Sequence, residues 1–271
     1  MEDGQGFDLN RLPKKISDRV EGLTWRLDKI GMSNSTILLY ANMVLKIEKV
    51  SRTSVNEKML LEWLDGKLPV PEIIEHIIQD EYSFLLMSGM SGEMACSNES
   101  MHGLERTVRA LASGLKMLWQ IDISNCPCSD VVSQKLMQVQ ENIGNNILDI
   151  GDFAPEVLGS FEFEDISHLY NYLDQNRPKC DMVFSHGDFC LPNVFVSGSE
   201  ITGVIDWGNG GIADRWQDIA LCVNSLRRNC MEYGLHGEEE YQRYERLLFS
   251  EIDIEPCEEK MSYYILLDEL F

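Results

Sequence analysis

Short apolar runs rich in β-branched residues alternate with polar turns in the first third of the chain. Residues 35–40 and 43–47 flank Ala41-Asn42, a pattern that predicts a β-hairpin. Two further runs, 73–78 and 82–87, predict two more strands. Between these pairs, residues 56–64 place apolar side chains at helical spacing and are followed by Gly66, so we expect one helix there. The first part of the chain is therefore predicted to be mostly sheet.

Helical periodicity dominates after the glycine-containing segment Ser88-Gly-Met-Ser-Gly92. Residues 104–121 carry leucine and valine on one helical face. Similar patterns predict helices over 133–147, 166–176, 216–229 and 238–250, and short strands over 193–196 and 201–205. We expect an α+β fold of two lobes. The predicted units are a small, mainly antiparallel β lobe (1–88), a linker (89–92) and a larger, mainly helical lobe (93–271).

Composition and charge narrow the possible partners. The chain has 45 acidic and 23 basic residues, a formal charge of −22, which repels the phosphates of nucleic acid and attracts cations. No Lys or Arg occurs between Lys135 and Arg177, whereas eight Asp and Glu residues do. No apolar run approaches the roughly 20 residues of a membrane span. The polar start lacks a signal-peptide pattern, and the eight cysteines form no CxxC pair, so we expect a cytoplasmic protein without disulfides or zinc.

The densest chemical signal lies between residues 183 and 208. It contains His186-Gly187-Asp188, then Asn193, then Asp206-Trp207-Gly208 after a predicted strand. Phosphoryl transfer requires an oriented nucleophile, Mg²⁺ and charge neutralisation. Asp188 is suited to accept the proton of an acceptor hydroxyl, and Asn193 and Asp206 are suited to ligate Mg²⁺. An isolated His-Gly-Asp usually marks a turn, but the Asp-Asn spacing and the second Asp-x-Gly match the loops of protein kinases.

The predicted β lobe supplies candidates for holding phosphates. Lys46 falls on a predicted strand and Glu57 on the predicted helix, a pair that suits a phosphate-binding lysine fixed by a carboxylate. A strand lysine alone is usually a solvated charge, so the downstream motif carries this assignment. No GxGxxG loop precedes Lys46. The segment Gly31-Met-Ser33-Asn-Ser35 offers amide and hydroxyl donors in its place.

These residues closely resemble the aminoglycoside 3′-phosphotransferases, bacterial antibiotic-resistance kinases with a protein-kinase-like fold. The resemblance covers about Gly31 to Phe271. Its most specific segments are Trp63-Leu-Asp-Gly-Lys-Leu-Pro-Val-Pro71, Ile121-Asp-Ile-Ser-Asn-Cys-Pro127, Phe184-Ser-His-Gly-Asp188, Ile212-Ala-Asp-Arg-Trp-Gln-Asp-Ile-Ala220 and Tyr263-Tyr-Ile-Leu-Leu-Asp-Glu-Leu-Phe271.

The resemblance implies a role for each matching position. Lys46, backed by Glu57, would contact nucleotide phosphates; Asp188 would be the catalytic base, with Asn193 and Asp206 as Mg²⁺ ligands. Asp218 would support the catalytic loop. The nucleotide base would be bound by the linker backbone at Ser88 and Met90 and by Phe195 and Ile205. The ammonium groups of the drug would be bound by Asp152, Glu156, Asp268, Glu269 and the carboxylate of Phe271.

The sequence departs from the family pattern at three positions. Val44 stands where many members have an aromatic residue, so either ATP or GTP is expected as co-substrate with Mg²⁺. Asn209 and Asn224 stand where arginine is common, so two positive charges near the phosphates are missing, a change that bears on turnover and on which hydroxyl is phosphorylated. The expected hydroxyl is the 3′-OH. Two alternatives stay open: a kinase of another small hydroxylated or cationic metabolite, and a catalytically weak nucleotide-binding relative. We expect a monomer or weak dimer whose partner is a small-molecule aminoglycoside.

Overall fold

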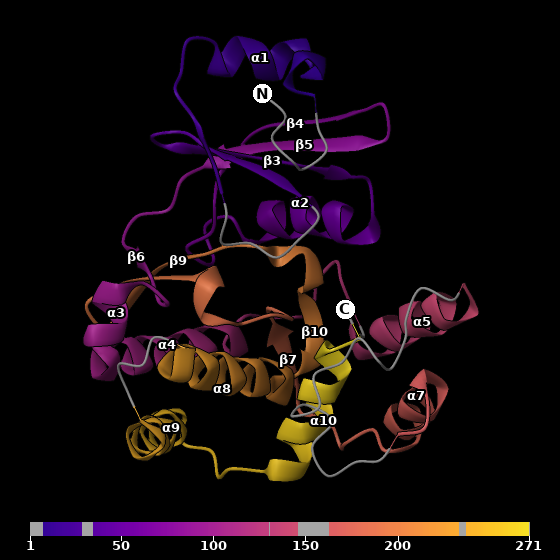
Figure 1. Ribbon diagram of the computed structural model, residues 1–271, viewed down its shortest axis with the longest axis vertical. Coiled ribbons are helices and arrows are strands. Elements are labelled where there is room, and N and C mark those ends of the chain that lie inside the picture. The colour runs from indigo at the N-terminus through magenta and orange to yellow at the C-terminus, as the bar shows by residue number, and fades with distance from the viewer. Residues whose placement is uncertain (1–7, 29–34, 130, 146–162, 233–236, 271) are drawn as a thin grey trace.

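The computed structural model describes residues 8–28, 35–129, 131–145, 163–232 and 237–270. It has two lobes, with a sheet in the upper one and mostly helices in the lower one (Figure 1). The expected α+β, protein-kinase-like architecture is confirmed. Within the described ranges, none of the helices is both long enough and apolar enough to cross a membrane.

The upper lobe is built on a five-stranded antiparallel sheet. The strand order is β1-β2-β3-β5-β4. The predicted hairpin is β2 and β3, which pair Ile37 with Lys46, and β5 pairs with β3 so that Leu85 lies opposite Lys46. Lys46 is therefore on a strand, as predicted, and this strand is the central one of the five. The bounds are β1 Arg26–Leu27, β2 Thr36–Leu39, β3 Met43–Lys49, β4 Ile73–Gln79 and β5 Tyr82–Ser88.

Two helices accompany this sheet. The predicted helix is α2 (Arg52–Leu64), which begins four residues earlier than expected because Ser51 and Ser54 form a capping box. The short α1 (Lys14–Val20) was not predicted. It buries Ile16 and Val20 against the sheet, too few apolar positions to show a helical period in the sequence.

The lower lobe contains all five helices predicted for it, with bounds within about three residues of those expected: α4, α5, α7, α8 and α9. Ile147, at the end of the expected range 133–147, lies outside the described residues. Short α3 and the C-terminal α10 were not predicted. The bounds are α3 Asn98–His102, α4 Leu104–Trp119, α5 Val131–Gly144, α7 Ile166–Gln175, α8 Arg215–Glu232, α9 Glu238–Ile252 and α10 Glu258–Asp268.

Short strands and turns of the lower lobe frame the chemical motif. The two predicted strands are β8 (Val194–Ser197) and β9 (Glu200–Val204). A third strand, β6 (Glu93–Met94), pairs with β8 in the same sheet. A second ladder, β7 (Met182–Ser185) with β10 (Gly211–Asp214), was not predicted; in β10 only Ile212 and Ala213 are apolar, between a glycine and an aspartate. Single-turn 3₁₀ helices are η1 Leu9–Arg11, η3 Leu191–Asn193 and η4 Trp207–Asn209.

The Trp-Leu-Asp-Gly-Lys-Leu-Pro-Val-Pro segment joins the two lobes. The Trp63 ring lies 5.1 Å from that of Phe184 on β7, centroid to centroid. The carbonyl of Pro69 accepts a 2.9 Å hydrogen bond from the amide of Val204. The lobes are thus connected here as well as through 89–92, which lies between β5 and β6. The eight cysteines all lie within the described ranges, and none forms a disulfide with another.

Candidate functional site

Lys46 makes an ion-pair cluster that spans both lobes. Its Nζ lies 2.8 Å from Glu57 Oε2 and 2.8 Å from Asp206 Oδ1. Strand β3, helix α2 and the turn after β9 therefore meet at one ammonium group. Lys46 and Glu57 are buried, whereas the Asp206 side chain is 46% exposed. The sequence-predicted Lys46, Glu57 and Asp206 are brought together.

Burial and charge act against each other in this cluster. Burial lowers the pKa of Lys46, but the neighbouring carboxylates outweigh it and raise that pKa above its ordinary value. Burial raises the pKa of Glu57 to about 7 despite Lys46 beside it. For Asp206, burial raises the pKa, but the Lys46 ammonium lowers it further. Lys46 and Asp206 are therefore charged near neutral pH.

Asp188 and Asn193 form the second half of the site. The Asn193 amide nitrogen donates to the Asp188 carboxylate at 2.9 Å and to the Asp188 carbonyl at 3.0 Å. Because both partners are acceptors, the amide oxygen of Asn193 must point the other way. The Asn193 carbonyl also accepts the amide of Ile205 at 2.9 Å, which joins this loop to the residue before Asp206.

The backbone before Asp188 is held by buried polar groups. Asp218 on α8 accepts the amides of His186 and Gly187 at 2.8 and 2.9 Å, which confirms its predicted supporting role. The Gly187 φ is +83°, and a Cβ there would lie 2.0 Å from the carbonyl oxygen of Asn209. Only glycine fits this position, which explains the His-Gly-Asp sequence.

His186 connects the two loops. Its Nδ1 accepts the Asp188 amide at 3.3 Å, so its Nε2 carries the hydrogen and donates to the Ile205 carbonyl at 2.9 Å. The ring is fully buried and meets Trp207 edge to face at 4.5 Å. Asp206, between Ile205 and Trp207 in the chain, has a left-handed backbone with φ 65°. This uncommon conformation in a residue other than glycine is typical of functional turns.

The surroundings of Asp188 suit a proton acceptor. Burial raises its pKa to about 6, His186 lowers it, and the Asp268 carboxylate raises it again. A carboxylate with a raised pKa takes a proton more readily than an exposed one does. Asp188 would still be mostly ionised at neutral pH.

The donor set of the site fits Mg²⁺ bound partly by phosphates. Asp206 offers a carboxylate and Asn193 an amide oxygen, and Mg²⁺ in kinases is commonly held by one or two such groups plus phosphate oxygens. Among the described residues, no group of three or more His, Cys, Asp or Glu could hold a metal by itself. The residues present therefore fit a metal that arrives with a nucleotide.

The predicted base-binding residues lie along the linker and the neighbouring strands. Phe195 and Ile205 are half-buried, whereas Val194, Val196 and Val204 beside them are buried in the core. Met90 packs on Gly203, where a Cβ would lie 2.6 Å from its Cε. The amide of Ser88 donates to Glu72 at 2.9 Å. Of the two linker positions, the Met90 amide is therefore the one to consider as a donor to a base.

Asp268 and Glu269, which were predicted to bind ammonium groups of the molecule that accepts the phosphoryl group, lie at the end of α10. The Asp268 carboxylate is 3.7 Å from Lys135 Nζ, and Glu269 is 3.0 Å from Arg228 Nη2. The helix is held by the buried Asp214, which accepts from Tyr264 Oη at 3.1 Å and Lys260 Nζ at 3.2 Å. Four other predicted residues lie outside the described part of the chain: Ser33, Asp152, Glu156 and Phe271.

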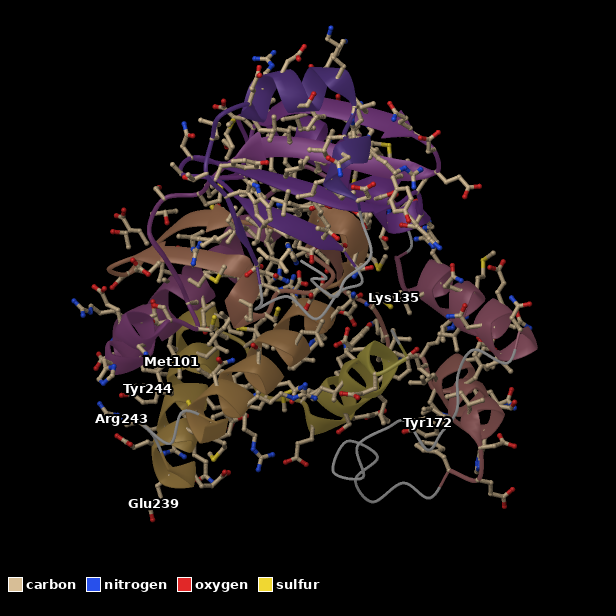
Figure 2. All side chains as sticks on the ribbon, turned by 45° about the horizontal axis from the view of Figure 1, so that its top comes forward. Met101, Lys135, Tyr172, Glu239, Arg243 and Tyr244 are labelled. Atoms are coloured by element: carbon tan, nitrogen blue, oxygen red, sulfur yellow. The ribbon has the colours of Figure 1, made fainter. Side chains whose placement is uncertain are left out.

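Sequence reasoning missed two contributors to this region. Asp214 was recognised in a motif but not as the anchor of α10. Lys135 was noted only as the edge of a basic-residue gap; it lies on α5 near the junction of the lobes (Figure 2). The local pattern of polar and apolar residues along α5 does not indicate that this lysine is buried. Asn209 lies on η4 and Asn224 on α8, both half-buried.

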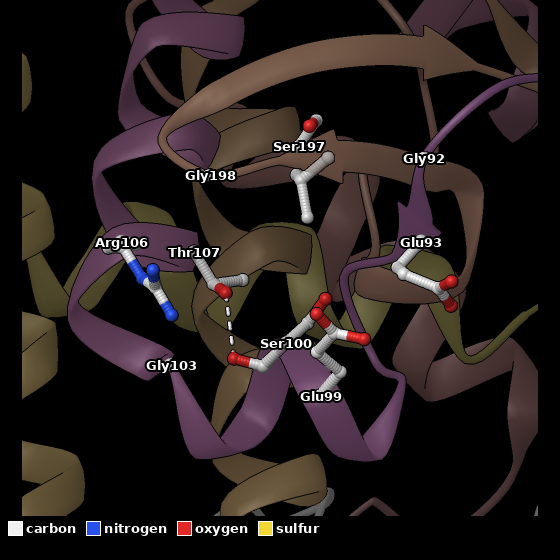
Figure 3. Close-up of a pocket in the computed structure, with 10 residues that line it drawn as sticks. Gly92, Glu93, Glu99, Ser100, Gly103, Arg106, Thr107, Ser197 and Gly198 are labelled. Carbon is white, nitrogen blue, oxygen red and sulfur yellow. Dashed lines mark hydrogen bonds between the residues drawn. The ribbon is translucent and has the colours of Figure 1, made fainter.

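The positions of two cavities in the described structure can be compared with that of the site. One, of about 310 Å³, is between α2, α5 and η4 beside the site. The other, of about 150 Å³, lies under the β8–β9 turn, where the Thr107 hydroxyl donates to the Ser100 carbonyl (Figure 3). Its lining includes Glu93, Glu99 and Arg106 but none of the predicted site residues. The first cavity is therefore the one that bears on the chemistry.

A two-lobed fold with a strand lysine, a helix glutamate and these Asp and Asn loops defines a protein-kinase-like phosphotransferase. The family model of the phosphotransferase enzyme family matches residues 24–250. The chain belongs to this family.

Individual relatives agree with this assignment. The chain is 36% identical to a Staphylococcus aureus aminoglycoside 3′-phosphotransferase, over 96% of this chain and 98% of the relative. It is 37% identical to one from Enterococcus faecalis, over 79% and 78% of the two chains. A crystal structure of an aminoglycoside-3′-phosphotransferase of type VIII superposes with a TM-score of 0.77 at 26% identity, covering 95% and 97%. The resemblance expected from the motifs is confirmed.

Proposed function

We propose that this chain transfers the γ-phosphoryl group of ATP or GTP to a hydroxyl of an aminoglycoside antibiotic, the 3′-hydroxyl by similarity to its relatives. The observation that carries the proposal is the convergence of Lys46, Glu57 and Asp206 beside the Asp188–Asn193 pair. This is the arrangement that phosphoryl transfer requires. The named relatives supply the class of acceptor.

On the nucleotide side, Lys46 would bind the α- and β-phosphates while Glu57 holds the ammonium in place. Asp206 and Asn193 would hold Mg²⁺, which supplies charge neutralisation when bound. Phe195 and Ile205 would contact the base, with the linker at Ser88 and Met90 along its edge. The predicted lobes, 1–88 and 93–271, would close on the nucleotide around 89–92. Ser33 belongs to the segment proposed to cover the phosphates.

On the acceptor side, Asp188 would accept the hydroxyl proton as the hydroxyl oxygen forms a bond to the γ-phosphorus. The bond from that phosphorus to the β-phosphate oxygen breaks, and the nucleoside diphosphate leaves. Asp268 and Glu269, with Asp152, Glu156 and the Phe271 carboxylate, would bind ammonium groups of the drug. Each exposed ion pair contributes roughly 0–1 kcal/mol, so several carboxylates are needed.

A product analysis tests the proposal. Purified protein is incubated with Mg²⁺ and ATP or GTP, and with kanamycin or a 3′-deoxy aminoglycoside such as tobramycin. We expect a kanamycin product carrying one added phosphate by mass spectrometry, placed at the 3′ position by NMR, and none with the 3′-deoxy drug. Phosphorylation of choline or homoserine in place of kanamycin would contradict the proposal. Nucleotide binding without any product would also contradict it.

A further inference from the structure

Lys135 is a buried lysine that the mechanism above does not use. The residue is only 5% exposed, and it lies on α5 in the lower lobe. A buried ammonium is costly unless paired groups compensate for its lost hydration. Its Nζ is 3.4 Å from the carbonyl oxygen of Gly187 and 3.7 Å from the Asp268 carboxylate. These two partners belong to opposite parts of the site.

The Gly187 carbonyl belongs to the peptide bond that leads into Asp188. It accepts from Gln217 Nε2 at 3.0 Å as well as from Lys135, and a carbonyl oxygen has two lone pairs for two such donors. The amide of Gly187 is held by Asp218. The Ser185 hydroxyl also accepts this amide, at 3.1 Å. Of these four side chains, Lys135 is the one that forms an ion pair with the acceptor-side helix α10.

Asp268 has room for a second cation. Its side chain is 38% exposed, so one part of the carboxylate faces Lys135 and another is open to solvent. An ionised carboxylate has about four acceptor sites. An ammonium group of an acceptor can therefore join Asp268 while Lys135 remains in place.

We propose that Lys135 is a positioning residue that ties Asp268 to the peptide before Asp188, so that an acceptor bound by α10 is aligned with the catalytic base. The inference rests on the proposed function, because it assumes that Asp268 contacts the acceptor. A link of this kind affects the rate more than nucleotide binding, since small errors in the alignment of reacting groups cost much of the catalytic advantage.

The cavity beside Lys135 determines which substitutions the site can accommodate, and so which variants can test the inference. This space of about 310 Å³ is lined by Lys135, Gly208 and Asn209 among others, and none of its lining residues is acidic. The larger guanidinium of arginine has room to extend into it while keeping a positive charge. Lys135→Arg should therefore preserve the link, whereas Lys135→Met keeps similar length and removes the charge.

The test is a double-mutant cycle on the full chain with a kanamycin acceptor. We expect Lys135→Met to lower kcat roughly 10-fold, with KM for the nucleotide within about twofold of wild type. Lys135→Arg should recover at least about a third of the rate. Because both residues act through one contact, Lys135→Met combined with Asp268→Asn should lose little more than the worse single variant. Lys58→Met, which removes an exposed lysine paired with Glu62, is the matched control and should match wild type.

Three results would overturn the inference. They are wild-type kcat in Lys135→Met, losses that multiply in the double variant, or a nucleotide KM that rises well beyond twofold. If Lys135→Met does not fold, Lys135→Gln, which keeps a donor for Gly187 without the charge, replaces it in the same cycle. Wild-type protein that makes no phosphorylated aminoglycoside would overturn the proposed function itself, whereas active wild type with an unaffected Lys135→Met overturns only this inference.

Discussion

The nucleotide side and the acceptor side of the site differ in how their charges are held. On the nucleotide side, Lys46 lies 2.8 Å from two carboxylates that come from a helix and a loop far apart in the sequence. On the acceptor side, the described carboxylates Asp268 and Glu269 are neighbours at the end of one helix. Their side chains are 38% and 21% exposed, and each faces a single cation of the lower lobe.

This difference fits the two proposed ligands. A triphosphate presents the same charges every time, so a buried and preorganised cluster suits it. Aminoglycosides differ in the number and position of their ammonium groups, and partly exposed carboxylates can adapt to them. Mutations on the nucleotide side should therefore have large and uniform effects, whereas those on the acceptor side should be smaller and depend on the drug.

The largest expected effect is at the boundary of the two sides. Asp188→Asn keeps the shape but removes the proton acceptor, so kcat should fall roughly 100-fold or more, as for other lost general bases. Nucleotide affinity, measured by calorimetry, should stay close to wild type. Turnover within a few-fold of wild type would remove Asp188 from the proposed role.

On the nucleotide side, Lys46→Met should lower kcat/KM for the nucleotide. Hydrogen bonds to charged groups contribute about 2 kcal/mol, or roughly 30-fold. KM for the aminoglycoside should change little, and steady-state kinetics with each substrate varied in turn measures both. Lys49→Met, at the exposed end of the same strand, is the matched control. An equal rise in both KM values would show that the two sides are not separable.

The pH dependence joins the two sides, because burial and Asp268 both raise the pKa of Asp188, to about 6 in all. A base works only when deprotonated, so a raised pKa makes activity fall earlier on acidification. We expect kcat/KM for the aminoglycoside to fall as the pH drops below about 6, with the midpoint moved to lower pH at saturating Mg²⁺-nucleotide, whose metal favours the ionised form. A flat profile down to pH 5 would contradict this.

The smallest effect is expected at Glu269. Glu269→Gln removes one partly exposed charge already shared with Arg228, so KM for the aminoglycoside should rise roughly 2- to 5-fold, in line with exposed ion pairs. The effect should shrink in high salt and differ among drugs. A loss above 50-fold, or one equal for all drugs, would contradict the comparison.

Predictability from sequence also differs between the two sides. Asp188, Asn193 and Asp206 follow a fixed local spacing, and such a spacing can be recognised in a single sequence. The C-terminal string was recognised only by resemblance, and its helix α10 was not predicted. What fixes α10 is the Tyr264–Asp214 hydrogen bond, a contact across 50 residues that no local pattern reveals.

Some short elements also could not be predicted from the sequence. Strand β10, which pairs with β7, has apolar side chains only at Ile212 and Ala213, so it shows no strand pattern of its own. Lys135 illustrates the same limit for a site. Its importance lies in Gly187 and Asp268, 52 and 133 residues away along the chain.

The Lys46–Glu57 pair has a consequence for control of the enzyme. Regulated protein kinases govern activity by making or breaking the equivalent lysine–glutamate contact through movement of the helix. Here α2 is also held from below, where Asn56 donates to the Gly208 carbonyl at 3.4 Å and Trp63 packs on Phe184. Because α2 is held against the lower lobe in the folded chain, we expect the Lys46–Glu57 pair to form without an activating modification.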